Sequence, residues 1–198
     1  MRQHMTLTLV GAALALSGCV SFGGKAPPLL LNLTSSASIA ANEVRSAGAG
    51  ESITIAVPMA PQAIATNRLA VSDGPVAIAY VKDAVWVEPP ARLFQRLLSE
   101  TVAAKTGKVV LDPRQFVLDP GIQLTGQLKN FGIDARTNEA VVIYDAAITR
   151  DKGKRVETRR FEARSGVSEI TATVSGAALN QAANKVAGEV AAWISGAQ

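Results

Sequence analysis

The chain contains one cysteine, Cys19, and one histidine, His4, and both stand close to its beginning. A single thiol cannot form an internal disulfide, and an unpaired thiol is a liability in an oxidising compartment. If the segment before Cys19 is an export signal, a covalent modification is the chemistry expected of this sulfur. His4 would leave with that segment, which excludes Ser-His-Asp and Cys-His catalysis in their usual forms and removes the commonest zinc ligand.

The segment before Cys19 has the composition of a secretory signal. Arg2 supplies a positive charge, residues 5–16 are mostly apolar, and small residues stand directly before the cysteine. This apolar stretch is too short to span a bilayer core, which needs about 20 residues. Leu16-Ser17-Gly18-Cys19 resembles the bacterial lipobox, in which the cysteine is joined to diacylglycerol, the signal is cut before it and the new amino terminus is acylated. An ordinary signal peptide with an incidental cysteine is the alternative.

These features predict a signal peptide over residues 1–18 and a lipidated Cys19. Each buried methylene of an acyl chain such as palmitate contributes about 0.8 kcal/mol, so three chains hold a protein in a membrane permanently for practical purposes. Residues 19–28 mix small residues, glycine and proline, which is typical of a flexible tether. We therefore expect a domain that is anchored to a membrane and does not span it.

The remainder of the chain, residues 29–198, is long enough to form a single domain whose core needs no disulfide. Loss of Arg2 would lower the formal net charge from +4 to +3. Such a charge could favour an anionic membrane or an acidic partner, but it falls well short of the clustered excess typical of nucleic-acid binders.

No catalytic or nucleotide-binding motif is recognisable. Gly48-Ala49-Gly50 lacks the third glycine and the following helix of a dinucleotide-binding loop. Carboxylates stand singly at predicted turns, where aspartate caps backbone amides, although two of them could still meet in space. We predict no catalytic residue, no cofactor and no metal site, and hence a protein that is not an enzyme.

Two helices are predicted. Apolar residues recur at three- and four-residue steps over residues 90–106, with Pro90 in the first turn and Gly107 as the end signal. A second helix is predicted over residues 175–194, with a narrow stripe rich in alanine.

Strands are predicted over most of the remaining chain. Residues 122–129 alternate apolar and polar residues, and a slip of the pattern past Lys129 indicates a β-bulge. A similar slip predicts a second bulge near Arg159 and Arg160. The predicted strands cover residues 29–33, 53–57, 69–71, 76–81, 108–111, 122–133, 140–149 and 156–163, with a turn at Asp73-Gly74, a loop over 59–69 and the last three strands in an antiparallel meander. The expected fold is α+β, a two-layer sandwich of a twisted mixed sheet with both helices on one face.

Two features allow both a structural and a functional interpretation. The basic stretch from Arg150 to Arg164, which includes Arg159 and Arg160, is either a solvated hairpin whose charges protect a sheet edge or a surface that binds lipid phosphates or an acidic partner. Trp86, followed by Pro89 and Pro90, is either a core residue or an exposed contact with an oligomer or partner.

An ordered series of short segments, together with the lipobox, resembles the ABC-type transport auxiliary lipoproteins, the PqiC-like proteins that accompany MCE-domain lipid transport systems in Gram-negative envelopes. The segments are Asn67-Arg68-Leu69-Ala70-Val71, Ile78-Ala79-Tyr80, Trp86-Val87-Glu88-Pro89-Pro90, Leu93-Phe94-Gln95-Arg96-Leu97-Leu98, Leu128 with Phe131, Phe161-Glu162-Ala163 and Ala191-Ala192-Trp193-Ile194.

This resemblance implies a periplasmic lipoprotein that works with an ATPase, a permease and an MCE-domain protein in phospholipid transport. Val20 follows the cysteine, and in the lipoprotein sorting pattern this favours the outer membrane. Partners would be the membrane, the MCE-domain and transporter proteins and phospholipid, with a homo-oligomer possible. The alternatives are a periplasmic lipoprotein that carries a lipid or solute in its own pocket, and a structural assembly factor of another envelope machine.

Overall fold

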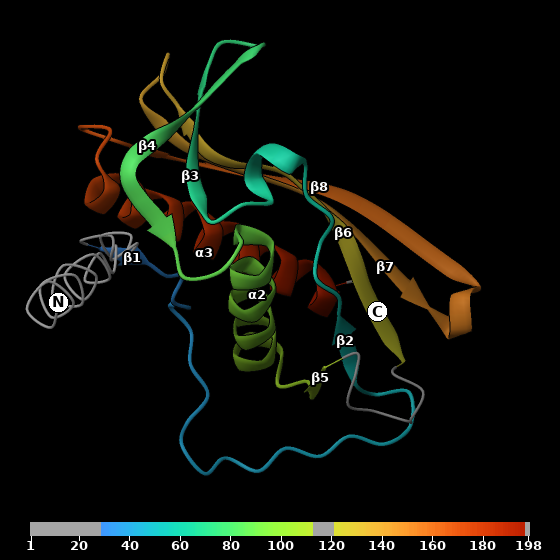
Figure 1. Cartoon of the computed structure of the whole chain (residues 1–198). Coiled ribbons are helices and arrows are strands. Elements are labelled where there is room, and N and C mark those ends of the chain that lie inside the picture. The colour runs from blue at the N-terminus through green and yellow to red at the C-terminus, as the bar shows by residue number, and fades with distance from the viewer. Residues whose placement is uncertain (1–28, 113–120, 197–198) are drawn as a thin grey trace, which may run out of the picture.

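A computed structural model describes residues 29–112 and 121–196 of the chain. The predicted signal peptide, the tether and Cys19 lie outside these residues. Helices α2 (Pro90–Thr106) and α3 (Ala172–Gly196) cover one face of a single mixed sheet (Figure 1). This arrangement confirms the predicted α+β fold. The strands are β1 (Leu30–Leu31), β2 (Ile53–Ile55), β3 (Arg68–Asp73), β4 (Ala77–Trp86), β5 (Val110–Leu111), β6 (Ile122–Asp134), β7 (Glu139–Arg150) and β8 (Arg155–Gly166), and 3₁₀ helices occur at Gln62–Ile64 (η2) and Asp151–Gly153 (η3).

Strand β6 is the strand around which the sheet is arranged. On one side it pairs antiparallel with β7, which pairs antiparallel with β8, so the predicted meander is confirmed. On its other side β6 pairs in parallel with two strands: β2 lies beside its first residues and β3 beside its last. The predicted loop between β2 and β3 contains η2 and the first two residues of β3. The sheet continues from β3 to β4 and β1, and from β2 to β5.

One of the two predicted bulges is present. The register of β6 against β7 shifts between Leu128 and Asn130, as the slip past Lys129 indicated. The second bulge, near Arg159 and Arg160, was wrong, because β7 and β8 pair without interruption along their whole length. The apparent slip came from Val156, which is 58% exposed and lies on the face that carries no helix.

The two helices pack side by side on the sheet through different kinds of side chain. Large apolar residues of α2 are buried, and the helix ends at Gly107, which adopts the left-handed conformation expected of it (φ 71°). Helix α3 begins three residues earlier than predicted. Its buried stripe is largely alanine, which lets its backbone approach the sheet closely; the members buried most completely are Leu179, Ala182, Ala183, Val186, Ala187, Val190, Ala191 and Ile194.

The centre of the core contains aromatic rings in edge-to-face contact. Phe94 of α2 lies 5.2 Å from Tyr144 of β7, measured between ring centroids. The Tyr144 ring covers Gly126 on the neighbouring strand, and its hydroxyl donates a hydrogen bond to the Thr125 carbonyl (3.0 Å). Burial raises the pKa of Tyr144. A side chain at position 126 would occupy the space that this ring fills.

We expect Gly126→Ala to destabilise the protein by about 2 kcal/mol, because overpacking a well-filled core costs roughly 1–3 kcal/mol. A Cβ atom at this position would overlap with the Asp145 carbonyl oxygen and would lie 2.6 Å from the Tyr144 ring. The matched control is Gly166→Ala at the end of β8, where a Cβ atom meets nothing within 4 Å. Urea unfolding of both variants measures the difference, and equal stabilities would contradict the close packing at Gly126.

Candidate functional site

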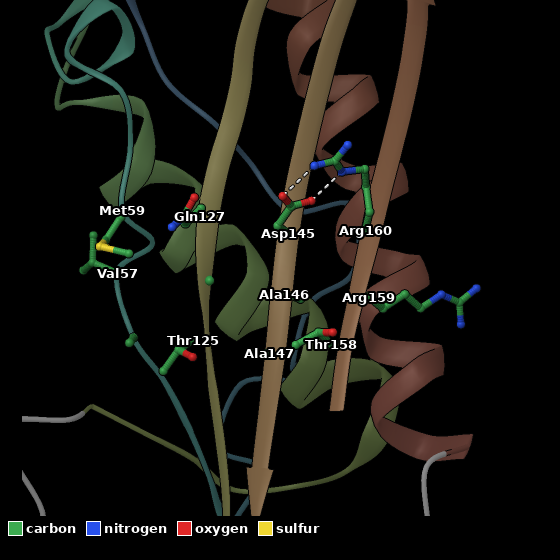
Figure 2. Close-up of a pocket in the computed structure, with 12 residues that line it drawn as sticks. Val57, Met59, Thr125, Gln127, Asp145, Ala146, Ala147, Thr158, Arg159 and Arg160 are labelled. Atoms are coloured by element: carbon green, nitrogen blue, oxygen red, sulfur yellow. Dashed lines mark hydrogen bonds and ion pairs between the residues drawn. The ribbon is translucent and has the colours of Figure 1, made fainter. Parts of the chain in front are cut away.

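A groove of about 920 Å³ lies on the face of the sheet opposite the helices. Its floor crosses three neighbouring strands, where Thr125 of β6, Ala147 of β7 and Thr158 of β8 stand in register (Figure 2). All three side chains are small. Alternate residues of a strand point to opposite faces of the sheet, so the residues on either side of these three face the helices. The small side chains leave the groove floor shallow and open.

The apolar wall of the groove is the segment that follows β2. The Met59 N–H donates to the Gly126 carbonyl (3.0 Å), and the Leu128 N–H donates to the Met59 carbonyl (2.7 Å). These bonds hold residues 56–59 against β6 and leave the side chains of Val57 and Met59 exposed. Met59 is 66% exposed and Val57 is also exposed, so the wall presents a thioether and a branched aliphatic side chain to solvent (Figure 2).

The opposite end of the groove carries an ion pair between strands. Arg160 donates through Nε to Asp145 Oδ1 (2.6 Å) and through Nη2 to Oδ2 (2.7 Å), which is the bidentate geometry that suits these two groups. The bond from Arg160 holds the pKa of the Asp145 carboxyl below its ordinary value, and the same bond raises the pKa of Arg160. The guanidinium of Arg160 is therefore already engaged by a carboxylate.

Arg159 and Arg160 do not form one surface. They are successive residues of a strand, so their side chains point to opposite faces, and Figure 2 shows Arg159 directed away from the Asp145–Arg160 pair. The Arg159 guanidinium lies 5.1 Å from the Phe161 ring centroid, and Phe161 in turn contacts Trp193 of α3. Within the described residues Arg159 forms no ion pair, so of the two arginines it is the one whose charge is open to a partner.

Trp86 is a core residue. It is 1% exposed and its ring lies edge-on to Phe131, with 5.6 Å between the ring centroids. The possible role of Trp86 in contacting a partner or a lipid headgroup is therefore contradicted, because the ring has no surface to offer. It occupies the last position of β4, and three residues separate it from α2.

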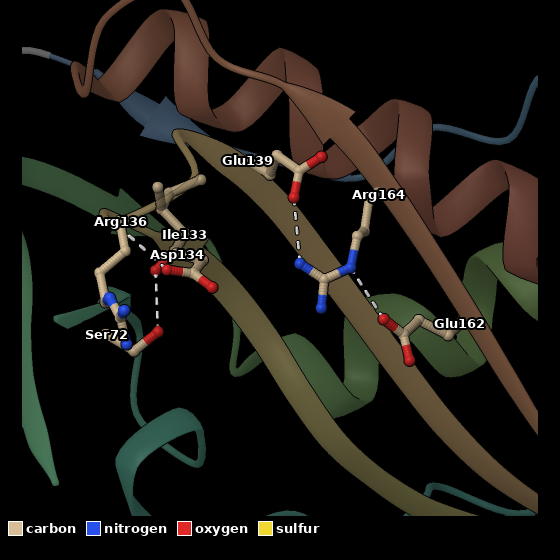
Figure 3. A network of polar contacts seen from close by, with 7 residues as sticks. All are labelled: Ser72, Ile133, Asp134, Arg136, Glu139, Glu162 and Arg164. Carbon is tan, nitrogen blue, oxygen red and sulfur yellow. Dashed lines mark hydrogen bonds and ion pairs between the residues drawn. The ribbon is translucent and has the colours of Figure 1, made fainter. Parts of the chain in front are cut away.

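The other end of the β6–β7–β8 ribbon is tied by a second group of polar contacts (Figure 3). Arg164 of β8 bonds to Glu139 of β7 (3.0 Å) and to Glu162 of its own strand (2.9 Å), and these bonds raise its pKa. In the turn after β6, the Asp134 side chain accepts a bond from the Arg136 N–H (3.0 Å). These ion pairs and this hydrogen bond pair the charged groups with one another and stabilise this end of the three strands.

The sequence did not indicate Val57 and Met59 as site residues. The alternation that marks β2 is interrupted at Pro58, so nothing in the sequence assigns these side chains to a face. In the described part of the chain, no group of three or more histidine, cysteine or acidic residues is placed to hold a metal ion. No helix among those described is both long and apolar enough to cross a membrane.

The model of the family described as the ABC-type transport auxiliary lipoprotein component matches residues 32–191 of this chain. The chain belongs to this family. No curated protein sequence matches it. The family description makes the chain an auxiliary lipoprotein of an ABC-type transport system, and the match extends from the residue after β1 through most of α3.

Solved structures with a TM-score of 0.64 share the fold of this auxiliary lipoprotein. Protein XCC0632 from Xanthomonas campestris is 20% identical, with a TM-score of 0.64 over 87% of this chain and 95% of that one. An uncharacterised protein is 12% identical, with the same TM-score of 0.64 over 76% of this chain and 96% of the other. A PelC dodecamer from Paraburkholderia phytofirmans is also similar, at 12% identity and a TM-score of 0.37 over 75% of this chain and 90% of the PelC chain.

We expect Arg160→Gln to lower the stability of the auxiliary lipoprotein slightly at neutral pH and to have no effect in strong acid. Because Arg160 depresses the pKa of Asp145 in the folded state, the stabilisation is complete above the ordinary Asp pKa of 3.8 and is lost as pH falls through the lower folded value. Urea unfolding at pH 7 and at successive values below 3.8 measures the difference. Arg159→Gln is the control, and a difference from wild type that persists at the lowest pH for Arg160→Gln would contradict this linkage.

Proposed function

We propose that this protein is an outer-membrane lipoprotein, held at the periplasmic face by acyl chains on Cys19, that acts as a non-enzymatic docking component of an MCE-type ABC phospholipid transport system. The match to the transport auxiliary lipoprotein family over residues 32–191 is the observation that carries this proposal. The lipobox supplies the anchor, residues 19–28 the tether and residues 29–198 a single docking domain. An anchor in the outer membrane would place the domain where a lipid conduit from the inner membrane must end.

The groove and the adjoining edge of β8 form the surface on which we place the docking contact, and an acidic segment of the MCE-domain protein is its occupant. Strand β8 along the groove edge carries four arginines, Arg155, Arg159, Arg160 and Arg164, against two glutamates, Glu157 and Glu162. The excess positive charge of β8 favours an acidic partner that reaches the edge of this strand, where Arg159 extends on the side away from the groove floor and forms no ion pair among the described residues. The exposed Val57 and Met59 add the apolar contact area that protein interfaces require.

A lipid or solute carrier is the second candidate, and the same groove argues against it. Carrier pockets enclose most of the ligand surface, whereas this groove is open along a sheet face and has one apolar wall. Native mass spectrometry of the delipidated domain separates the two functions. A stoichiometric bound phospholipid would favour the carrier, and a ligand-free protein favours the docking component.

We expect Cys19→Ser to release the protein from the outer membrane, because the acyl chains provide nearly all of its membrane affinity. Fractionation of the cell envelope should move the variant from the outer-membrane fraction to the soluble periplasm. Mass measurement of the wild-type protein should show a diacylglyceryl group and a further acyl chain on Cys19. An unmodified sulfur in the mature wild-type protein, or a retained signal peptide, would contradict the proposal.

We expect Arg159→Glu to weaken binding to the MCE-domain protein on the order of tenfold at low ionic strength, and less as salt is raised, because it replaces an exposed attraction with a repulsion. The control is Lys185→Glu, which makes the same change of charge at an exposed position of α3, in the other layer. Pull-down from envelope membranes, followed by titration with the purified partner, measures the effect. Equal losses of affinity in both variants would show that the groove edge is not part of the contact. If wild type recovers no MCE-domain protein, the result counts against the proposed transport system.

A further inference from the structure

The hairpin of β3 and β4 projects beyond the two layers of the domain, and its tip is apolar (Figure 1). The turn passes through Gly74 (φ 82°), and residues 75–79 are all exposed. Val76 is 93% exposed and Ile78 is 57% exposed. Exposed aliphatic side chains grouped in this way on a projecting element mark a contact surface more often than isolated ones do.

No other described element covers this tip. Strand β1 reaches β4 only at Val85 and Trp86, at the base of the hairpin. Between base and tip, the pairing of β3 with β4 shifts register opposite Leu69, and Asp83 takes a positive φ of 57°. A bulge of this kind bends the strand that contains it. Strand β3 stays paired with β6 as far as Ser72, opposite Asp134, so the residues of the tip from Asp73 to Ala77 extend past the end of β6.

The described part of the chain begins on the side of β1 that faces this tip. Strands β1 and β4 are parallel, with Leu30 opposite Val85, and β4 begins at the tip and runs to the base. Leu29, where the described residues begin, therefore lies on the tip side of Leu30. From Val85 back to Val76 the strand extends about 30 Å, and the ten residues 20–29 can extend about 33 Å. The anchor can thus bring a membrane to the level of the hairpin tip.

We propose that the tip of the β3–β4 hairpin inserts into the surface of the phospholipid membrane that holds the acyl chains of Cys19. This inference rests on the lipid anchor of the proposed function. The aliphatic side chains of Val76 and Ile78 enter the boundary between headgroups and acyl chains, as apolar faces of interfacial proteins do. Asp73, the last residue of β3, limits the depth of insertion because a carboxylate is costly in the acyl region.

Behind the tip, the hairpin carries the side chains that suit the headgroup layer. The Arg68 guanidinium lies 3.9 Å from the centroid of the Tyr80 ring, and Lys82 is exposed on the same strand as Tyr80. Aromatic rings with one polar end and cations on long stems concentrate at membrane interfaces. A flexible tether alone would leave the domain free to rotate, whereas the hairpin adds a second point of attachment and fixes which surfaces face away from the membrane.

The test uses the full chain, in which lipidation of Cys19 occupies the only native thiol. Val76→Cys then supplies a single free thiol for an environment-sensitive fluorophore. The matched control is Val156→Cys on β8, a valine that is also exposed but lies away from the hairpin. Both labelled proteins are reconstituted in vesicles of phosphatidylethanolamine and phosphatidylglycerol that contain a lipid quencher near the headgroups. We expect about twofold or greater quenching, with a blue shift, at position 76 and no change at position 156.

Flotation of the same vesicles separates this inference from the function on which it rests. If the proteins float with the vesicles and neither probe is quenched, the hairpin contact is overturned and the anchor stands. If the wild-type chain does not float, the anchor fails and the hairpin contact fails with it. If the probe at position 76 is shielded only when the MCE-domain protein is added, the lipid surface is the wrong partner and the hairpin is a protein contact.

Discussion

Both helices bury the same face of the sheet, and this one-sided burial determines which surfaces of the molecule are open. The inner residues of β6 and β7, such as Leu124, Leu128 and Tyr144, are almost completely covered. Among the described residues, the segment after β2 pairs with β6 at Met59 and borders the outer face, where the groove lies. A sheet covered on one side separates apolar from polar residues with a period of two, and the groove lies on the polar side.

The close approach of α3 to the sheet reduces the number of large side chains that the core needs. Its alanine stripe keeps the helix backbone near the sheet, so large side chains are needed only from α2 and the strands. Gly126 has the same effect on β6, because the absence of a side chain gives the Tyr144 ring room to lie over the strand and contact Phe94. The core is therefore filled by a few aromatic rings seated against small residues, and a substitution that enlarges one small residue displaces a ring.

The elements that could be predicted are those whose sequence pattern reflects local geometry. The alternation of β6, the bulge after Leu128 and the end of α2 at Gly107 each depend on neighbouring residues, and each was predicted correctly. The second bulge was wrong because alternation cannot distinguish a slip in register from an exposed valine on the uncovered face. The separation of Arg159 from Arg160 follows from strand geometry, but the role of Val57 and Met59 depends on long-range pairing with β6, which no local pattern specifies.

The strand directions relate the groove to the two proposed membrane contacts. Strand β3 runs toward the hairpin tip and β6 runs parallel to it, so the end of β6 at Asp134 lies on the tip side and its beginning at Ile122 on the far side. The groove floor at Thr125 belongs to the far part of β6, about 30 Å from Asp134 at roughly 3.3 Å per residue. If the tether and the hairpin tip both meet the outer membrane, the groove and the beginning of β8 at Arg155 are directed into the periplasm. A partner that extends from the inner membrane would then meet the apolar wall and the basic strand edge first, without approaching the anchored end of the domain.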